Sequence, residues 1–300
     1  MERISAVINV VDREIPDLRR ALSSLKKIAS EIVIVDMTSS DEVNKIASGY
    51  QVKVYKHDLV NYVEIVRNFG ISKTQNEWIL IMDPDEEISV DLAEKLKDVV
   101  SKKEADYFRL PRKNIIFGKW IKHSRWWPDY NIRFFKKGYV SWNEIIHSVP
   151  MTQGKGIDLD PSEENSIIHY HYKSVEQYIE RMNRYTSVQA GNLLKNGYCF
   201  DWRDLIKKPF NEFMSRYFDG NGFKDGLHGL VLAGLQAFSE LTVYLKVWQS
   251  DKFKDYNTDP KKTLGVMDEI VSDYHHWRAD TLLKSGGSFV QKIKRKFKLP

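Results

Sequence analysis

Four acidic residues lie within five positions directly after an apolar run. The run is WILIM, at residues 78–82, and the acids are Asp83, Asp85, Glu86 and Glu87. Carboxylates this close repel one another unless a cation lies among them. Asp83 and Asp85 are separated by a single proline that stiffens the turn, and two acids at this spacing can present oxygens to a hard divalent cation. The sequence therefore predicts a metal site here.

Glu86 and Glu87 have a different interpretation. The segment that follows them, SVDLAEKLKDVV at residues 89–100, has a helical pattern. Acidic residues are favourable near a helix N-terminus. We interpret both glutamates as solvated residues that start this helix, with a place beside the cation as the alternative.

The first hundred residues alternate between strand and helix patterns. Short β-branched apolar runs predict strands at residues 4–11, 31–36, 52–57 and 78–83. Between the strands, the apolar spacing after Pro16 and the patterns over 39–50 and 62–74 predict helices. This order predicts an α/β fold in which a mostly parallel sheet has helices on both faces.

The predicted sheet brings distant acids together. Right-handed crossovers place the carboxyl ends of all parallel strands at one edge, and ligands bind where the strand order reverses. Asp12 follows the first strand, Asp36 ends the second, and Asp83 and Asp85 follow the fourth. Asp36 either contacts a ligand at this edge or caps the next helix.

Beyond residue 105 the pattern changes to mixed strands and loops that are rich in aromatic and basic residues. Nucleic-acid binding uses such residues, but the regular RNA and single-strand motifs are missing. A carbohydrate or phosphosugar pocket needs the same side chains, so we expect a sugar-type ligand and no nucleic-acid partner. Helical patterns dominate after Tyr172.

Composition and charge bear on the compartment and on membrane contact. The single cysteine, Cys199, excludes an internal disulfide framework and fits a reducing, cytoplasmic compartment. The net charge is +5, and residues 281–300 contain basic and apolar side chains without an acid. This tail is either solvated or a contact for an anionic membrane surface.

The longest apolar segment, residues 227–248, includes His228, Glu240 and Lys246. Such side chains are costly at a bilayer centre, so we do not expect a membrane span. Instead, this segment and the stretch 202–217 form either a platform at the membrane interface or a surface packed on the rest of the chain or on a second subunit.

The order and spacing of several motifs resemble the family 2 glycosyltransferases, and more narrowly the bacterial branch of lipopolysaccharide core glucosyltransferases. The match runs over roughly residues 4–248, and its motifs are VINVVD, VDMTSSDEV, RNFG, WILIMDPDEEI, KNIIFGKWIKH, WWPDYNIRFF, IIHSV, IIHYHYKSVEQYIERMNRY and GFKDGLHGL. The resemblance implies a GT-A fold and inversion at the anomeric carbon. It also implies a nucleotide-diphosphate sugar donor, most simply UDP-linked, and a Mg²⁺ or Mn²⁺ ion.

The resemblance further implies roles for residues of the nucleotide site. Asp36 would contact the nucleobase, with Asp12 near it where the family more often has an Asn-Glu pair. Arg67 would line the nucleotide pocket. Asp83 and Asp85 match the family's DxD motif, in which the first acid faces the ribose or the metal and the second binds the metal.

An inverting transfer also needs a base for the acceptor hydroxyl. Asp129 lies where other branches of the family have this base, and His147 is the rival, although relatives tend to have His-Glu where this chain has His147 and Ser148. His169 matches a histidine typical of the branch and is expected near the diphosphate and metal. Arg133 would pair with phosphate or hold a carboxylate.

The resemblance implies a catalytic domain over residues 1–173, with a nucleotide-sugar half at about 1–105 and an acceptor half at about 106–173. A helical extension with amphipathic segments follows over 174–300. The expected acceptor is a glycan or glycolipid such as lipopolysaccharide core, at the inner face of the cytoplasmic membrane, and an oligomer is compatible with these features.

Two other functions are considered. A metal-dependent sugar nucleotidyltransferase shares the sheet and the acid-held metal, but the first strand lacks the glycine-rich, basic nucleotide loop that would favour it. A catalytically silent membrane-associated binding module would be expected to lose an acid from the metal motif, and both Asp83 and Asp85 are present.

Overall fold

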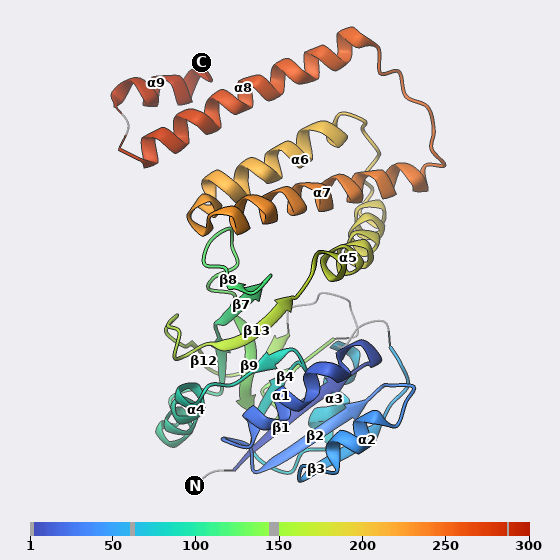
Figure 1. The fold of residues 1–300 in the computed structure, drawn as a ribbon, viewed down its shortest axis with the longest axis vertical. Coiled ribbons are helices and arrows are strands. Elements are labelled where there is room, and N and C mark those ends of the chain that lie inside the picture. The colour runs from blue at the N-terminus through green and yellow to red at the C-terminus, as the bar shows by residue number, and fades with distance from the viewer. Residues whose placement is uncertain (1–2, 61–63, 144–149, 287) are drawn as a thin grey trace. The chain divides into compact units, whose positions relative to one another are not determined.

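A computed structural model describes residues 3–60, 64–143, 150–286 and 288–300 (Figure 1). The chain divides into two compact units. The first contains residues 1–115 and 127–171, and the second contains residues 116–126 and 172–300. Residues 116–126, which the sequence analysis assigned to the acceptor half, therefore pack with the second unit.

A seven-stranded sheet forms the centre of the first unit. Its strand order is β12-β6-β9-β4-β1-β2-β3. The strands are β1 (Ile4–Val10), β2 (Glu31–Asp36), β3 (Val52–Lys56), β4 (Trp78–Met82), β6 (Tyr107–Leu110), β9 (Asn131–Lys136) and β12 (Gly156–Asp158). Only β9 runs antiparallel to its neighbours, β4 and β6. The mostly parallel α/β fold is thus confirmed, and the strand order reverses between β1 and β4.

Helices cover both faces of this sheet (Figure 1). On one face lie α1 (Ile15–Leu25), α2 (Glu42–Ala47) and α4 (Val90–Lys102), and on the other lies α3 (Glu64–Ser72). Residues of β1 alternate between the two cores: Ile8 packs with Leu18 of α1, whereas Val7 packs with Ile71 of α3. Burial on both faces explains why these strands are continuous apolar runs.

Gly70 allows α3 to lie close to the sheet. A Cβ atom at this position would be 2.5 Å from Cγ1 of Val7 and 3.1 Å from Cγ2 of Val35. Arg67 lies one helical turn before this glycine. The close approach of α3 therefore sets how far Arg67 stands from the carboxyl end of β4.

Short strands complete the first unit. In a second sheet, β5 (Glu86–Glu87) lies beside β13 (Ile167–Tyr172), which lies beside β7 (Arg112–Ile116). The remaining short elements are the 3₁₀ turn η1 (Asp12–Glu14), β10 (Val140–Ser141) and β11 (Met151–Thr152). Glu86 and Glu87 thus belong to a strand, and α4 begins only at Val90.

The second unit is helical apart from β8 (Lys119–Trp120). It contains α5 (Val175–Lys195), α6 (Asp204–Met214), η2 (Ser215–Asp219), η3 (Gly222–Asp225), α7 (Leu227–Ser250), α8 (Pro260–Lys284) and α9 (Phe289–Phe297). By length and composition, α7 is the one helix in the described part of the chain that is apolar enough to cross a membrane. Its polar side chains bond within the unit: Gln236 donates to the Tyr178 hydroxyl at 2.8 Å, and Lys246 donates to Thr186 at 2.8 Å.

Candidate active site

The acids after β4 lie in a tight turn at the carboxyl edge of the sheet. The backbone N–H of Glu86 donates to the carbonyl of Asp83 at 3.0 Å, which closes a turn with Pro84 at its second position. The Glu86 carboxylate in return accepts from the backbone N–H of Asp83 at 2.9 Å. The turn holds the side chains of Asp83 and Asp85 in fixed directions.

Asp83 is neutralised by two arginines. Arg67 of α3 approaches one carboxylate oxygen at 3.4 Å, and Arg133 of β9 pairs with the other. Burial acts to raise the pKa of Asp83, but the charges of Arg133 and Arg67 outweigh it and hold the pKa well below its usual range. The first acid of this turn is therefore ionised and held by arginines.

Glu86 is also part of this charge cluster. Its side chain is fully buried and accepts from Arg133 at 2.7 Å and from Arg112 of β7 at 3.4 Å. The interpretation of Glu86 as a solvated residue is wrong, because the arginines of two strands converge on it. Glu87 is half-buried and accepts from the Tyr170 hydroxyl at 3.1 Å. Arg133 holds carboxylates, which is one of the two roles expected for it.

Asp85 faces His169 across a short gap. Both residues are buried, and Oδ2 of Asp85 lies 3.7 Å from Nε2 of His169. The backbone N–H of Tyr170 donates to the Asp85 carbonyl at 2.9 Å, so β13 positions the acid and the histidine together. These two residues, 84 positions apart in the sequence, meet because β13 pairs with β5.

The hydrogen bonds around His169 determine which ring nitrogen carries a proton. Asn114 of β7 donates from Nδ2 to Oδ2 of Asp129 at 3.1 Å. The contacting atom must be this nitrogen, because a carboxylate can only accept a hydrogen bond. The amide oxygen of Asn114 therefore points to Nδ1 of His169 at 2.6 Å, so Nδ1 is the donor. The lone pair of Nε2 then faces the Asp85 carboxylate. A cation between them removes their repulsion.

Asp129 belongs to the same network. Its Oδ2 accepts from Arg112 at 2.6 Å, and its Oδ1 lies 3.3 Å from Nδ2 of Asn131. The side chain is 29% exposed, so one side of it faces solvent. A continuous chain of contacts thus links Asp85 through His169 and Asn114 to the candidate base.

Asp12 and Asp36 lie in the loops after β1 and β2. Oδ1 of Asp36 accepts from the backbone and hydroxyl of Thr38 at 2.8 and 2.7 Å, and Oδ2 pairs with Lys56 at 2.8 Å. Asp12 is exposed and accepts from the backbone N–H of Ser39 at 3.1 Å. The two acids brace one loop. Asp36 does not cap α2, whose N-cap residue is Asp41.

Glu14 was missed by the sequence analysis. Its carboxylate accepts from the backbone N–H of Val11 at 3.3 Å within η1. Burial raises its pKa to about 7. The positive charge of Arg13 acts against this rise, and the negative charges of Asp83 and Asp85 add to it. A raised glutamate pKa next to two acids is a common feature of functional sites.

Arg112 and Asn114 were missed as well. They alternate along β7, and this i, i+2 spacing in the motif RKN was the available signal that both side chains lie on one face. Asp83, Asp85, Arg67, Asp129 and His169 are brought together by the structure. His147 lies outside the described residues.

The described residues contain no group of three or more His, Cys, Asp or Glu side chains arranged as a metal site. Asp85 and His169 nevertheless fit a divalent cation, because they present a carboxylate oxygen and an imidazole lone pair to one point. Mg²⁺ commonly takes one or two carboxylates and completes its shell with water and substrate phosphates. Two protein ligands are therefore sufficient for a cation shared with a diphosphate.

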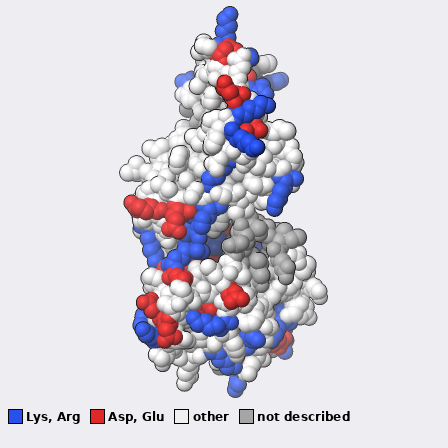
Figure 2. Space-filling model, turned by 90° about the vertical axis from the view of Figure 1, so that its right-hand side faces the viewer, with Lys and Arg blue, Asp and Glu red and all other residues white. Residues whose placement is uncertain are grey.

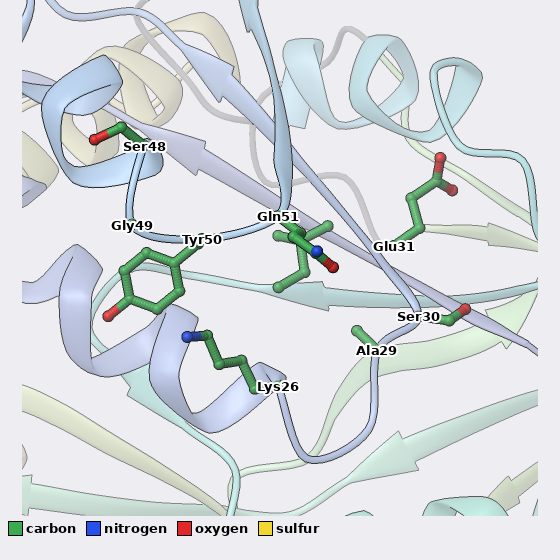
Figure 3. A pocket seen from close by; sticks show the side chains of 9 residues that line it. Lys26, Ala29, Ser30, Glu31, Ser48, Gly49, Tyr50 and Gln51 are labelled. Carbon is green, nitrogen blue, oxygen red and sulfur yellow. The ribbon is translucent and has the colours of Figure 1, made fainter.

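Two hollows of the molecule lie away from this network. A cavity of about 400 Å³ lies at the opposite edge of the sheet, between the start of β2 and the start of β3, and Figure 3 shows Lys26, Glu31 and Tyr50 on its wall. A second cavity of about 590 Å³ lies within the helical unit, between the loop before α6 and helix α8. Neither contains the acids after β4.

The chain is similar in sequence or fold to several known proteins. An uncharacterized glycosyltransferase of Rickettsia typhi is 28% identical over 88% of this chain and 96% of the relative. A lipopolysaccharide core biosynthesis glycosyltransferase of Rhizobium meliloti, LpsC, is 22% identical over 79% of this chain and 89% of the relative. Among solved structures, residues 1–349 of S. aureus TarS in complex with UDP has 15% identity and a TM-score of 0.44, over 85% of this chain and 93% of TarS 1–349.

The family model described as glycosyl transferase family 2 matches residues 5–154. This range contains all but the first residue of β1, the strands β2 to β4 and the acidic turn, and it is half of the chain. The chain therefore belongs to glycosyl transferase family 2 and is a glycosyltransferase.

Proposed function

We propose that this protein moves a sugar, with inversion, from a UDP-linked donor to a glycan or lipid-linked acceptor such as lipopolysaccharide core. Membership of the family supports the nucleotide-sugar class of donor. The relative whose name refers to lipopolysaccharide core biosynthesis supports the acceptor class. The acceptor would be met at the inner face of the cytoplasmic membrane.

The observation that carries the proposal is the pair Asp85 and His169, whose acceptor atoms face each other at 3.7 Å. We propose both as ligands of a Mg²⁺ or Mn²⁺ ion. When bound, this ion would stabilise the negative charge that develops on the leaving diphosphate. Asn114 holds the histidine in the tautomer that has its Nε2 lone pair free for a cation.

The other residues of the edge bind and orient the donor in this proposal. Arg67 and Asp83 line the nucleotide pocket, and their ion pair fixes the position of the Arg67 guanidinium. This guanidinium also lies 5.3 Å from the centre of the Trp142 ring. Asp36 and Asp12 brace the loop at the nucleobase end. Because both oxygens of Asp36 already have partners, a nucleobase would share one of them.

Asp129 or His147 removes the proton of the acceptor hydroxyl as its oxygen bonds to the anomeric carbon. The bond between that carbon and the diphosphate oxygen breaks at the same time, and the nucleoside diphosphate leaves with the electron pair. Arg112 and Asn114 orient Asp129 for this step through its Oδ2 atom. General-base catalysis of this kind contributes about 10²- to 10⁴-fold.

A thermal-shift comparison tests the proposal. UDP-, GDP-, CMP- and dTDP-sugars are each added with and without Mn²⁺. A ligand that binds only the native state raises its stability by about 2.7 kcal/mol at 100 times Kd. We expect a shift with the UDP-sugars that reaches its full size only with the metal.

Asp85→Asn should lose the metal-dependent part of the shift, whereas the matched change Asp91→Asn, at an exposed position in the first turn of α4, should retain it. A shift that is equally large without metal, or that survives in Asp85→Asn, contradicts the metal site. A shift with another nucleotide class alone contradicts the UDP donor.

A further inference from the structure

Helix α9 is attached to α8 through its polar face. Arg295 pairs with Asp280 of α8 at 2.8 Å, and Lys298, which follows the helix, pairs with Asp273 at 2.6 Å. Nδ1 of His276 also lies 3.2 Å from the carbonyl oxygen of Arg295. Figure 1 shows α9 lying along the last turns of α8.

The apolar side chains of α9 are turned away from these contacts. Phe289, Val290, Ile293 and Phe297 occupy positions i, i+1, i+4 and i+8, which share one face of an α-helix. Their exposed fractions are 71%, 54%, 42% and 62%. Arg295 and Lys298 lie on the opposite face. An amphipathic helix that packs on its own protein normally buries its apolar face, so α9 has the reverse orientation.

Cations border the exposed apolar face. Lys292 and Lys296 lie along one edge of it, and neither has an acidic partner among the described residues. Residues 281–300 contain no acid of their own. Over α8, by contrast, Figure 2 shows basic and acidic side chains next to one another at the upper end of the view. Helix α8 contains four basic and four acidic residues, whereas α9 contains four basic residues and no acid, so the surplus of positive charge belongs to α9.

We propose that α9 is an interfacial helix that inserts Phe289, Val290, Ile293 and Phe297 into an anionic lipid bilayer, while its ion pairs with Asp273 and Asp280 of α8 hold it in that orientation. An apolar face bordered by lysines, with the charged heads able to reach lipid phosphates, is the pattern of helices that lie in the membrane interface. The charge complementarity favours anionic lipid over an apolar protein partner.

The inference deepens the proposed function, since a lipid-linked acceptor lies in such a surface, but its test needs neither donor nor acceptor. The full-length protein is sedimented with vesicles of 30% phosphatidylglycerol in phosphatidylcholine and with vesicles of pure phosphatidylcholine. We expect binding to the anionic vesicles that weakens as salt is added.

Two double variants and two matched controls distinguish the contributions. Lys292→Glu with Lys296→Glu should weaken binding by more than about 30-fold, since each lysine near an anionic surface contributes about fivefold and the new glutamates are repelled. Phe289→Ser with Phe297→Ser should weaken it by about 100-fold. The controls, Phe253→Ser and Lys254→Glu with Lys261→Glu, change exposed residues outside α9 and should bind like the unaltered protein.

The four residues changed in α9 are exposed, so the variants should unfold at the same temperature as the parent. These residues are Phe289, Lys292, Lys296 and Phe297. Three results would overturn the proposal: no binding of the parent to anionic vesicles, equal binding by the α9 variants, or a parent that is dimeric in light scattering and becomes monomeric in Phe289→Ser with Phe297→Ser. The last result would make the apolar face a subunit interface. Transfer activity that fails with intact vesicle binding would contradict the proposed function alone.

Discussion

The two edges of the central sheet carry charge in different ways. At the carboxyl edge, Arg133 is buried between Asp83 and Glu86, and the contacts continue from there to other charged side chains. At the amino edge, Glu31 pairs with Lys53 at 2.7 Å, and the lysine side chain is 44% exposed. The amino edge nevertheless has the cavity of about 400 Å³. The converging charged groups and this cavity therefore lie at opposite edges of the sheet.

The loops that connect the strands to the helices explain this difference between the two edges. Strand order reverses between β1 and β4 at the carboxyl edge, so the loops after these strands diverge and leave room for side chains from β7, β9 and β13 to enter. At the amino edge of β2 and β3 the connections are short and the polar groups pair locally, as in the bond from Ser5 to Glu31 at 2.5 Å.

The largest difference between the edges should be in stability. Arg133→Met leaves the buried carboxylate of Glu86 and the partly exposed carboxylate of Asp83 without their shared cation, and breaking a buried pair such as Arg133 and Glu86 costs about 3–5 kcal/mol. We expect urea denaturation to show a loss of this size. The matched change Lys53→Met, which opens a partly exposed pair, should leave the urea midpoint nearly unchanged. Equal losses would mean that the two edges do not differ in this respect.

A smaller effect, on the affinity for Mn²⁺, should distinguish variants of the two asparagines that contact Asp129. Asn114 also bonds His169, whereas Asn131 does not. Asn114→Leu frees the histidine tautomer, and loss of such an orienting partner weakens metal binding by about 10- to 100-fold. Mn²⁺ titration should show this loss, and ¹⁵N spectra of the histidines should show a mixed tautomer for His169. Asn131→Leu serves as the control, and an equal loss in both variants would argue against the role of Asn114.

The smallest effect should appear in the pH dependence of stability. The pKa of Glu14 is raised in the folded protein, from 4.5 to about 7, so this group makes the native state less stable as pH rises through that range. Glu14→Gln should therefore be more stable than the parent at pH 8 and equally stable below pH 4.5.

Glu31 should show the opposite sign. Although its partial burial acts to raise the pKa, its bonds with Lys53 and Ser5 lower it, so the group stabilises the fold above its unfolded pKa and loses this effect on acidification. Glu31→Gln should thus lose stability at pH 8. Unfolding curves at pH 4, 6 and 8 measure both variants, and slopes of the same sign would contradict this comparison of the edges.

The sequence by itself determined the elements and one part of the site. The apolar runs over β1, β2 and β4 predict buried parallel strands because both faces of these strands are covered, and the run ends directly at Asp83 and Asp85. Local pattern is sufficient where a residue's environment depends on its near neighbours in the chain. The order of motifs then led to the glycosyltransferase family, which the match over residues 5–154 shows.

Tertiary structure alone decided what each charge does. Glu86 follows two acids in a turn and looks solvated, yet it is fully buried, because Arg112 and Arg133 arrive from strands 26 and 47 residues away. In the same way, Asp83 and Asp85 are equivalent in the sequence, but the first is held by arginines and the second faces His169. The protonation and role of a carboxylate depend on groups within a few ångströms, and in this fold those groups come from separate strands whose pairing no local pattern specifies.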